Sequence, residues 1–288
     1  LSASAYSDYI SCPLKFCYKR VIGIKEKDED ELSVSNIGIG NIFHYAMEDI
    51  YKARIGRTID KKYVDLVNKN MDKIIQRAFK RQFKIENNET FTYRNEQLII
   101  KEVIREFIKK VLRYDLNNNQ LIITDVEKDI ILENAFSFNF LGATKMISLK
   151  GVLDRVDQLQ GEIRLIDYKT GNSELKYKSE EELFSQSTGD RKKTIFQALL
   201  YQWMYRKSEN IKDVQKIGNH IYSIRSMNKI SDSTSIEKNK QNISDIEVEN
   251  WMSTFEEKLS NLTQEIFDLE IPFTQTKEPK TCIKCHYN

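Results

Sequence analysis

The hydrophobic residues in the first part of the chain recur with the period of an α-helix. Residues 4–22 predict a short helix, then Pro13 and a second helical turn, and residues 25–32 are a run of charges that predicts a loop. Amphipathic helices are predicted at residues 37–53, 60–85 and 92–114. The second of these has an apolar stripe made of Met71, Ile74, Ile75, Ala78 and Phe79.

The pattern changes after residue 120. Strands are predicted, from β-branched and aromatic residues in partial alternation, at residues 120–140, 147–158, 162–170 and 214–225. Helical periodicity returns at residues 191–207 and 245–270. This order predicts a mixed α/β domain rather than a regular βαβ series. We expect one domain over residues 1–288, with a helical insertion near residues 52–118.

The composition excludes several classes of protein. The 288 residues are 40% hydrophobic with 10 Gly and 3 Pro, too apolar for a disordered chain and too poor in Gly and Pro for a fibre. The net charge of +2 gives no global field, so an anionic partner must be bound by a local patch. No apolar run approaches the roughly 18–20 residues that span a bilayer, and we expect no signal peptide. We expect a cytoplasmic protein without membrane contact and, since the chain begins with Leu1, a fragment of a longer protein.

Candidate chemistry is concentrated in residues 151–171, GVLDRVDQLQGEIRLIDYKTG. If Gln160-Gly161 forms a two-residue turn, Asp154 lies opposite Asp167, and strand alternation places both on one face with Lys169. Two carboxylates about 4 Å apart repel by roughly 1 kcal/mol in water and about 4 kcal/mol near a protein surface. A divalent cation removes this repulsion, and Lys169 could then orient or deprotonate a water or offset phosphate charge. In the alternative, the register differs and both Asp are surface residues.

Asp154, followed by Asp167-Tyr168-Lys169, resembles the paired acidic motif of the PD-(D/E)xK nuclease superfamily. The wider pattern resembles its RecB-like exonuclease branch, the nuclease domain of AddB-type helicase–nuclease complexes. SASAYSDYISCPLKF resembles the N-terminal element of that branch, GIGNIFHYAMEDI its helix with a metal-binding histidine, and QALLYQWMY its Gln-x-x-x-Tyr helix. The resemblance implies a restriction-endonuclease-like α/β core, in which helices flank a central mixed sheet.

The resemblance also implies roles for the matching residues. His44, Asp154 and Asp167 would bind Mg²⁺ or Mn²⁺ with the carbonyl of Tyr168, and Lys169 would position the attacking water. Gln197 and Tyr201 would support the site and touch the DNA backbone. The residues alone leave other interpretations open: a lone helical histidine is usually structural, and the Gln197–Tyr201 pair, four residues apart, also suits the polar edge of a core helix. Glu48, one turn beyond His44, is a possible extra ligand or a partner of the histidine.

Two groups of basic residues are weaker candidates for DNA contact. Lys73 and Arg77 belong to a basic helix stripe, although such stripes are ordinarily just solvated. The second group, between Gly171 and Lys193, contains Lys176, Arg191 and Lys192. Because this segment also holds five acidic residues, we expect it to be a flexible solvated loop.

The cysteines lie in pairs near the two ends of the chain, at Cys12, Cys17, Cys282 and Cys285. The resemblance implies that Cys12, Cys282 and Cys285 are three of the four ligands of a [4Fe–4S] cluster. The fourth family cysteine would lie beyond Asn288. Cys17 is a poor substitute, because on a helix it is rotated about 140° from Cys12. The alternative is four free thiols.

From these features we expect a metal-dependent DNA nuclease, an exonuclease acting on single-stranded ends in recombination and repair, with a helicase domain or subunit as partner. One alternative is a non-catalytic DNA-binding relative, against which the intact His44, Asp154, Asp167 and Lys169 argue. Others are a nuclease of the same fold in CRISPR adaptation or restriction, and a structural module that binds metal without cleaving DNA.

Overall fold

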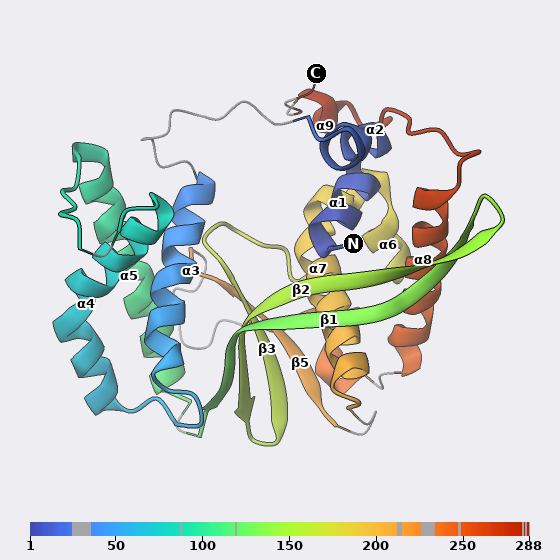
Figure 1. Cartoon of the computed structure of the whole chain (residues 1–288). Coiled ribbons are helices and arrows are strands. Elements are labelled where there is room, and N and C mark those ends of the chain that lie inside the picture. The colour runs from blue at the N-terminus through green and yellow to red at the C-terminus, as the bar shows by residue number, and fades with distance from the viewer. Residues whose placement is uncertain are drawn as a thin grey trace.

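A four-stranded sheet lies at the centre of the fold, with strand order β1-β2-β3-β5 in our computed structural model (Figure 1). β1 (Ile122–Phe140), β2 (Ala143–Leu159) and β3 (Glu162–Lys169) pair antiparallel, and β5 (Ile217–Ser223) runs parallel to β3. The structure describes residues 1–24, 36–86, 88–118, 120–211, 215–225, 234–246, 249–283, 285 and 287. The charged run predicted as a loop at residues 25–32 lies outside these residues.

Helices cover both faces of the sheet (Figure 1). One face packs against α3 (Asn36–Lys52), α4 (Lys61–Gln82) and α5 (Asn95–Leu116). The other packs against α1 (Ala3–Ser11), α7 (Gln186–Ser208) and α8 (Glu249–Phe267). The fold is therefore the predicted restriction-endonuclease-like one, a mixed sheet flanked by helices. The range predicted as a helical insertion holds α4 and α5.

Shorter elements complete the described part of the chain. They are α2 (Pro13–Phe16), a π-helical turn (Cys17–Ile22), β4 (Lys176–Tyr177), α6 (Glu180–Phe184), β6 (Glu237–Lys238), β7 (Gln241–Asn242), a 3₁₀ turn (Ile243–Asp245) and α9 (Pro279–Ile283). Strands β4, β6 and β7 form a second, small sheet. No helix in the described ranges is both long and apolar enough to cross a membrane.

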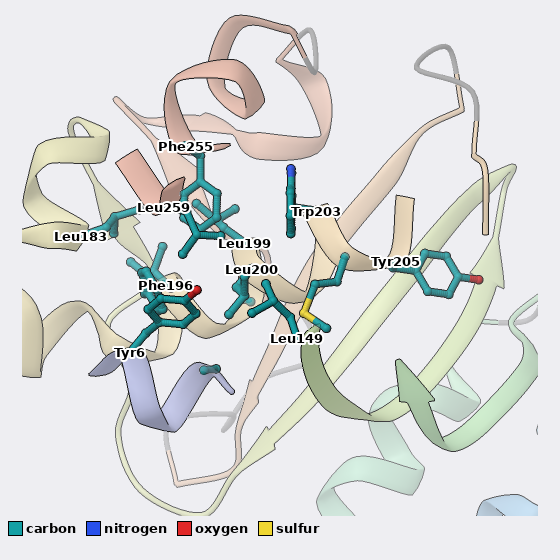
Figure 2. Packing of buried hydrophobic residues seen from close by; sticks show 14 of the residues in the cluster. Tyr6, Leu149, Leu183, Phe196, Leu199, Leu200, Trp203, Tyr205, Phe255 and Leu259 are labelled. Atoms are coloured by element: carbon teal, nitrogen blue, oxygen red, sulfur yellow. The ribbon is translucent and has the colours of Figure 1, made fainter. Parts of the chain in front are cut away.

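The packing of α7 fixes the helix that carries Gln197 and Tyr201. Its apolar side is buried as the sequence predicted, through Ile195, Leu199, Leu200, Trp203 and Met204. Figure 2 shows side chains of α7 lying between Tyr6 of α1, Leu149 of β2 and Phe255 of α8. Because helix and sheet share this core, Gln197 and Tyr201, which border the apolar side of α7, are held in fixed positions beside β2 and β3.

β1 and β2 form one long hairpin, where the sequence predicted two strands separated at residues 141–146. Leu141 and Gly142 form its turn, with φ of +50° and +80°. The outer part of the hairpin reaches across α7 and α8 (Figure 1). Two aromatic contacts hold it there: the Phe136 ring stacks on Trp203 and the Phe138 ring on Phe267, at centroid distances of 5.7 and 4.4 Å.

The segment between Gly171 and Lys193 is folded into a short strand and helices, so the prediction of a loop is wrong. It contains β4, α6 and the start of α7. Its few apolar residues decide this outcome, since Tyr177 and Leu183 are buried in the main core despite the surrounding charges. Burial of two large side chains stabilises a structure by about 1.5–3 kcal/mol each.

Candidate active site

The hairpin between β2 and β3 brings Asp154 close to Asp167. Gln160 and Gly161 both have positive φ, +51° and +84°, as a tight two-residue turn requires. The register, with Val156 opposite Leu165, is the one the sequence predicted. Ladder pairing ends at Arg155, and one oxygen of Asp154 then accepts a hydrogen bond from the backbone N–H of Tyr168 at 2.7 Å. The two carboxylates therefore lie where the strands begin to separate.

His44 reaches this point from α3. Its Nδ1 lies 3.3 Å from Oδ1 of Asp154, and its Nε2 lies 3.1 Å from the carbonyl oxygen of Tyr168. The ring also packs edge-on against the Tyr168 ring. The histidine, the aspartate and the carbonyl, which lie far apart in the sequence, thus meet in space.

Glu127 is a further acidic residue at this point, and the sequence analysis missed it. It lies on β1 directly across from Asp154, between the pairs Val126–Arg155 and Lys128–Leu153. Nitrogen and oxygen donor atoms of His44, Glu127 and Asp154 all lie within 4.8 Å of one another. The backbone of Glu127 has a φ of +49°, which is rare for a residue with a side chain.

Lys169 and Gln197 surround the other carboxylate. Nζ of Lys169 donates to Oδ1 of Asp167 at 2.8 Å and to Oε1 of Gln197 at 3.4 Å. The amide nitrogen of Gln197 donates to the same Asp167 oxygen at 3.3 Å. Burial alone would lower the pKa of Lys169. The negative charges of Asp167 and Asp154 raise it by more, so the pKa lies above its ordinary value. The ammonium therefore keeps its proton and is suited to orienting a water or offsetting phosphate charge.

Tyr201 lies one turn beyond Gln197 and its ring covers Gly151 of β2. A Cβ atom at residue 151 would lie 2.4 Å from Cε1 of Tyr201, so the close approach of α7 to β2 requires glycine here. Burial and the nearby Asp167 raise the pKa of Tyr201, which keeps its hydroxyl protonated.

Burial and mutual charge shift the pKa values of the acidic groups and the histidine. Burial alone would lower the pKa of His44, but the negative charges of Asp154 and Asp167 have the larger effect and raise this pKa to about 9. Burial, then the charge of Asp154, raises the pKa of Glu127 to about 7. Burial also raises the pKa of Asp167, whereas in Asp154 the charge of His44 outweighs burial and the pKa falls. Negative charge is crowded into a poorly solvated space, a condition that a cation relieves.

The residues present fit a hard divalent cation. Carboxylate oxygens and an imidazole nitrogen are donors that such ions accept. Within the described residues, Oδ2 of Asp167 is buried without a hydrogen-bond partner. A buried, unsatisfied acceptor destabilises the fold by about 1–3 kcal/mol, and more when it is charged. A cation bound among these carboxylates would satisfy it.

Glu48, predicted as an extra ligand or a partner of His44, instead pairs with two basic side chains. Its carboxylate bonds Lys52 and, at 2.7 Å, Nη2 of Arg81. The guanidinium of Arg81 also stacks on Tyr45, 4.1 Å from the ring centroid. Together these contacts connect α3 to α4 beside the site.

Three of the residues suggested for DNA contact, Arg77, Lys176 and Lys192, are paired with acidic side chains. Lys73 is exposed, whereas Arg77 on the same helix bonds Asp49 at 3.0 Å. Lys176 is exposed and paired with Glu237 at 3.1 Å. Lys192 is buried, and its Nζ bonds Glu174 at 2.7 Å and the carbonyl of Lys176, so its charge is already compensated. The side chain of Arg191 lies outside the part that the structure describes.

The two ends of the chain meet, as the cysteine pattern suggested. The N–H of Leu14 donates to the carbonyl of Thr274 at 3.0 Å, and the N–H of Thr276 to Sγ of Cys12 at 3.4 Å. Sγ of Cys282 accepts from Gln275 at 3.2 Å. Across the described residues, however, no group of three potential ligands includes a cysteine. Such groups are those that could hold a single metal ion, and the thiolates of a [4Fe–4S] cluster lie farther apart, so the cluster stays a prediction.

The model of the PD-(D/E)XK nuclease superfamily matches residues 1–288, so the chain belongs to that superfamily. This agrees with the resemblance carried by Asp154, Asp167 and Lys169.

Three similar proteins are each named as a subunit of an ATP-dependent helicase/deoxyribonuclease. Those of Alkaliphilus oremlandii (strain OhILAs) and Alkaliphilus metalliredigens (strain QYMF) are 27% identical over 191 and 192 residues. That of Thermoanaerobacter sp. (strain X514) is 28% identical over 192 residues. The matched segments cover 60%, 60% and 61% of this chain, which spans only 16% of each relative's length.

Proposed function

We propose that this chain is the nuclease domain of a helicase–nuclease and hydrolyses DNA phosphodiester bonds with Mg²⁺ or Mn²⁺. The observation that carries the proposal is the cluster of His44, Glu127 and Asp154 donor atoms beside the Asp167–Lys169 pair. We further propose exonucleolytic action on single-stranded ends, in recombination and repair. The names of the relatives support a deoxyribonuclease.

The proposed mechanism assigns a step to each side chain. His44, Glu127, Asp154 and Asp167 would hold the cation with the carbonyl of Tyr168. When bound, it would supply Lewis-acid stabilisation of the charge that develops on the scissile phosphate. The Lys169 ammonium would orient the attacking water, and Gln197 would fix the Lys169 and Asp167 side chains through its contacts with both. The Tyr201 hydroxyl would contact the DNA backbone.

The proposed setting is a cytoplasmic complex in which a helicase delivers the strand. The support is indirect: the relatives are named as helicase/deoxyribonuclease subunits, and this chain corresponds to 16% of their length.

The proposal is tested by digestion of end-labelled DNA. Linear and circular substrates, single- and double-stranded, are incubated with Mg²⁺, Mn²⁺ or EDTA. We expect metal-dependent loss of linear single strands and sparing of circles. Lys169→Ala should reduce the rate by about 10²–10⁴-fold, because the water loses its orienting group. Lys145→Ala, an exposed lysine on the β1–β2 hairpin, is the matched control and should cut normally.

Two outcomes would contradict parts of the proposal. Equal cutting of circles and linear strands would replace the exonuclease assignment with an endonuclease. Failure of the wild type to cut any substrate, while calorimetry still detects bound Mn²⁺, would favour a metal-binding or DNA-binding module of the same fold.

A further inference from the structure

Directly beneath the candidate metal site, on the other face of β2 and β3, lies a fully buried group of charged and phenolic side chains. We call it the buried arginine network. Its members, each at most 2% exposed, are Tyr51, Asp115, Arg155, Asp157, Arg164, Tyr168 and Tyr222. None of these side chains belongs to the proposed reaction, although the backbone carbonyl of Tyr168 does.

Asp115, near the end of α5, is the common acceptor of the network. Its Oδ2 accepts from Nη1 of Arg155 at 2.6 Å and from the hydroxyl of Tyr51. Its Oδ1 accepts from Nη2 of Arg155 at 3.2 Å and from the hydroxyl of Tyr222 at 2.9 Å. One carboxylate therefore makes four hydrogen bonds to residues of three other elements.

Arg155 extends the network to the catalytic strands. Its Nη1 donates to the Tyr168 hydroxyl at 3.0 Å and its Nη2 to the Tyr222 hydroxyl at 3.2 Å. It also pairs with Asp157 at 2.8 Å and stacks on the Tyr51 ring at 4.5 Å. The guanidinium thus contacts α3, β2, β3 and β5 at once.

Stability alone is a poor explanation for these buried charges. Removing two carboxylates and two guanidinium groups from water is expensive, and well-packed apolar residues of similar size often stabilise a fold equally well or better. Burial raises the pKa of Asp157, which shows the same desolvation cost. The geometry of the network suggests what it contributes instead.

The elements α3, β2 and β3 carry proposed metal ligands, and each of them also carries a member of the network. On β2 and β3 it is the next residue: Arg155 follows Asp154, and Tyr168 follows Asp167, so each points to the opposite face of its strand. On α3, Tyr51 lies seven residues beyond His44, about 20° away around the helix, and so on the same side. β5 contributes Tyr222 but carries none of these ligands.

We propose that Asp115 and Arg155 are positioning residues for the metal site, and that α5 supplies the carboxylate which fixes α3, β2 and β3 relative to one another. Asp115 holds the α3 helix through Tyr51, while Arg155 holds Tyr168 and thereby the carbonyl that faces His44. This inference rests on the proposed function, because it concerns the affinity of that site for its metal.

The test compares a hydroxyl deletion within the network with one outside it. Asp115→Asn risks a general loss of folding, so the informative variants are Tyr51→Phe and Tyr6→Phe. Each removes one buried hydroxyl and its hydrogen bond, to Asp115 from Tyr51 and to Thr263 from Tyr6, but only Tyr51 lies on an element that carries a ligand. Mn²⁺ binding is measured by calorimetry without DNA, with thermal unfolding of the metal-free proteins alongside.

Tyr51→Phe should weaken Mn²⁺ binding about tenfold, as loss of an orienting contact behind a ligand does. Tyr6→Phe should leave the Mn²⁺ dissociation constant unchanged while lowering the melting temperature by a similar amount. Equal dissociation constants for the two variants would reduce the network to a structural role and overturn the inference. A wild type that binds no Mn²⁺ would instead refute the metal site of the proposed function, and the inference with it.

Discussion

At the residue scale, Glu127 is unfavourable for the fold in two ways. Its φ of +49° places a residue with a Cβ in the left-handed region, at a cost of about 1–2 kcal/mol. Its carboxylate is crowded against Asp154 and poorly solvated, which raises its pKa to about 7. Strain of this kind persists where the rest of the fold enforces it, and it is frequent at functional sites.

Glu127→Gly should therefore separate stability from metal binding. Glycine adopts this backbone without strain, and the repulsion with Asp154 disappears, so the metal-free protein should gain about 1 kcal/mol in free energy of unfolding. Mn²⁺ binding should weaken at least about tenfold, because a ligand is lost. Urea unfolding and calorimetry measure the two quantities.

Asn134→Gly is the matched control for this experiment. Asn134 lies on the same strand with a φ of +52°, in the part of the hairpin that crosses α7. It should gain some stability, less than Glu127→Gly because Asn tolerates this region better, and should keep its Mn²⁺ affinity. Unchanged Mn²⁺ affinity in Glu127→Gly would remove Glu127 from the ligand set.

At the scale of the elements, the approach of α7 to β2 depends on Gly151. A methyl group there would meet the Tyr201 ring at 2.4 Å. Gly151→Ala should lower the free energy of unfolding by about 1–3 kcal/mol, because either the ring or the helix must move. Most of this loss should be recovered when Tyr201→Ala is added, which urea unfolding of the double-mutant cycle measures.

Gly171→Ala is the control, since open space surrounds that residue and its φ is not positive. It should change the free energy of unfolding by no more than about 0.5 kcal/mol. If Gly151→Ala is equally damaging with and without the Tyr201 ring, the contact is not the reason for glycine at residue 151.

The elements also show why the site could be predicted only in part. The turn at Gln160-Gly161 is short and fixes the register of β2 against β3, so the approach of Asp154 to Asp167 followed from the sequence. β1 is different. If β1 and β2 kept the register that they have next to the hairpin turn, Asp129 would lie opposite Asp154. An irregularity between Leu132 and Phe136 shifts the register by two residues, so Glu127 lies opposite Asp154 instead. Nothing in the periodicity signals such a bulge.

The long helices were predictable for a related reason. A stripe such as Met71 to Phe79 repeats over several turns, and the structure buries all of it. β4 and α6 are too short for any period, and they form only because Tyr177 and Leu183 find places in a core assembled from distant segments. Local pattern cannot supply that information.

At the scale of the whole molecule, non-covalent contacts join the two ends of the chain. The rings of Tyr9, Phe16 and Phe273 form an aromatic group, with Phe273 6.2 Å from Tyr9 and 5.9 Å from Phe16 between centroids. The backbone bond from Leu14 to Thr274 lies beside it. Aromatic pairs of this kind contribute about 0.5–1.5 kcal/mol each beyond the area they bury. These contacts join the ends, and they include neither Cys282 nor Cys285.

The joint substitution Cys282→Ser with Cys285→Ser tests this view of the molecule. Both thiols are partly exposed, so the melting temperature under anaerobic conditions should stay within about 2 °C of the wild type. Mn²⁺ affinity and iron content should not change either. Cys12→Ser is the contrasting variant: its thiol is buried and accepts the N–H of Thr276, so a smaller polar group should lower the melting temperature further. If the wild type carries iron and the double variant loses both the iron and several degrees of stability, a cluster rather than the aromatic group joins the ends.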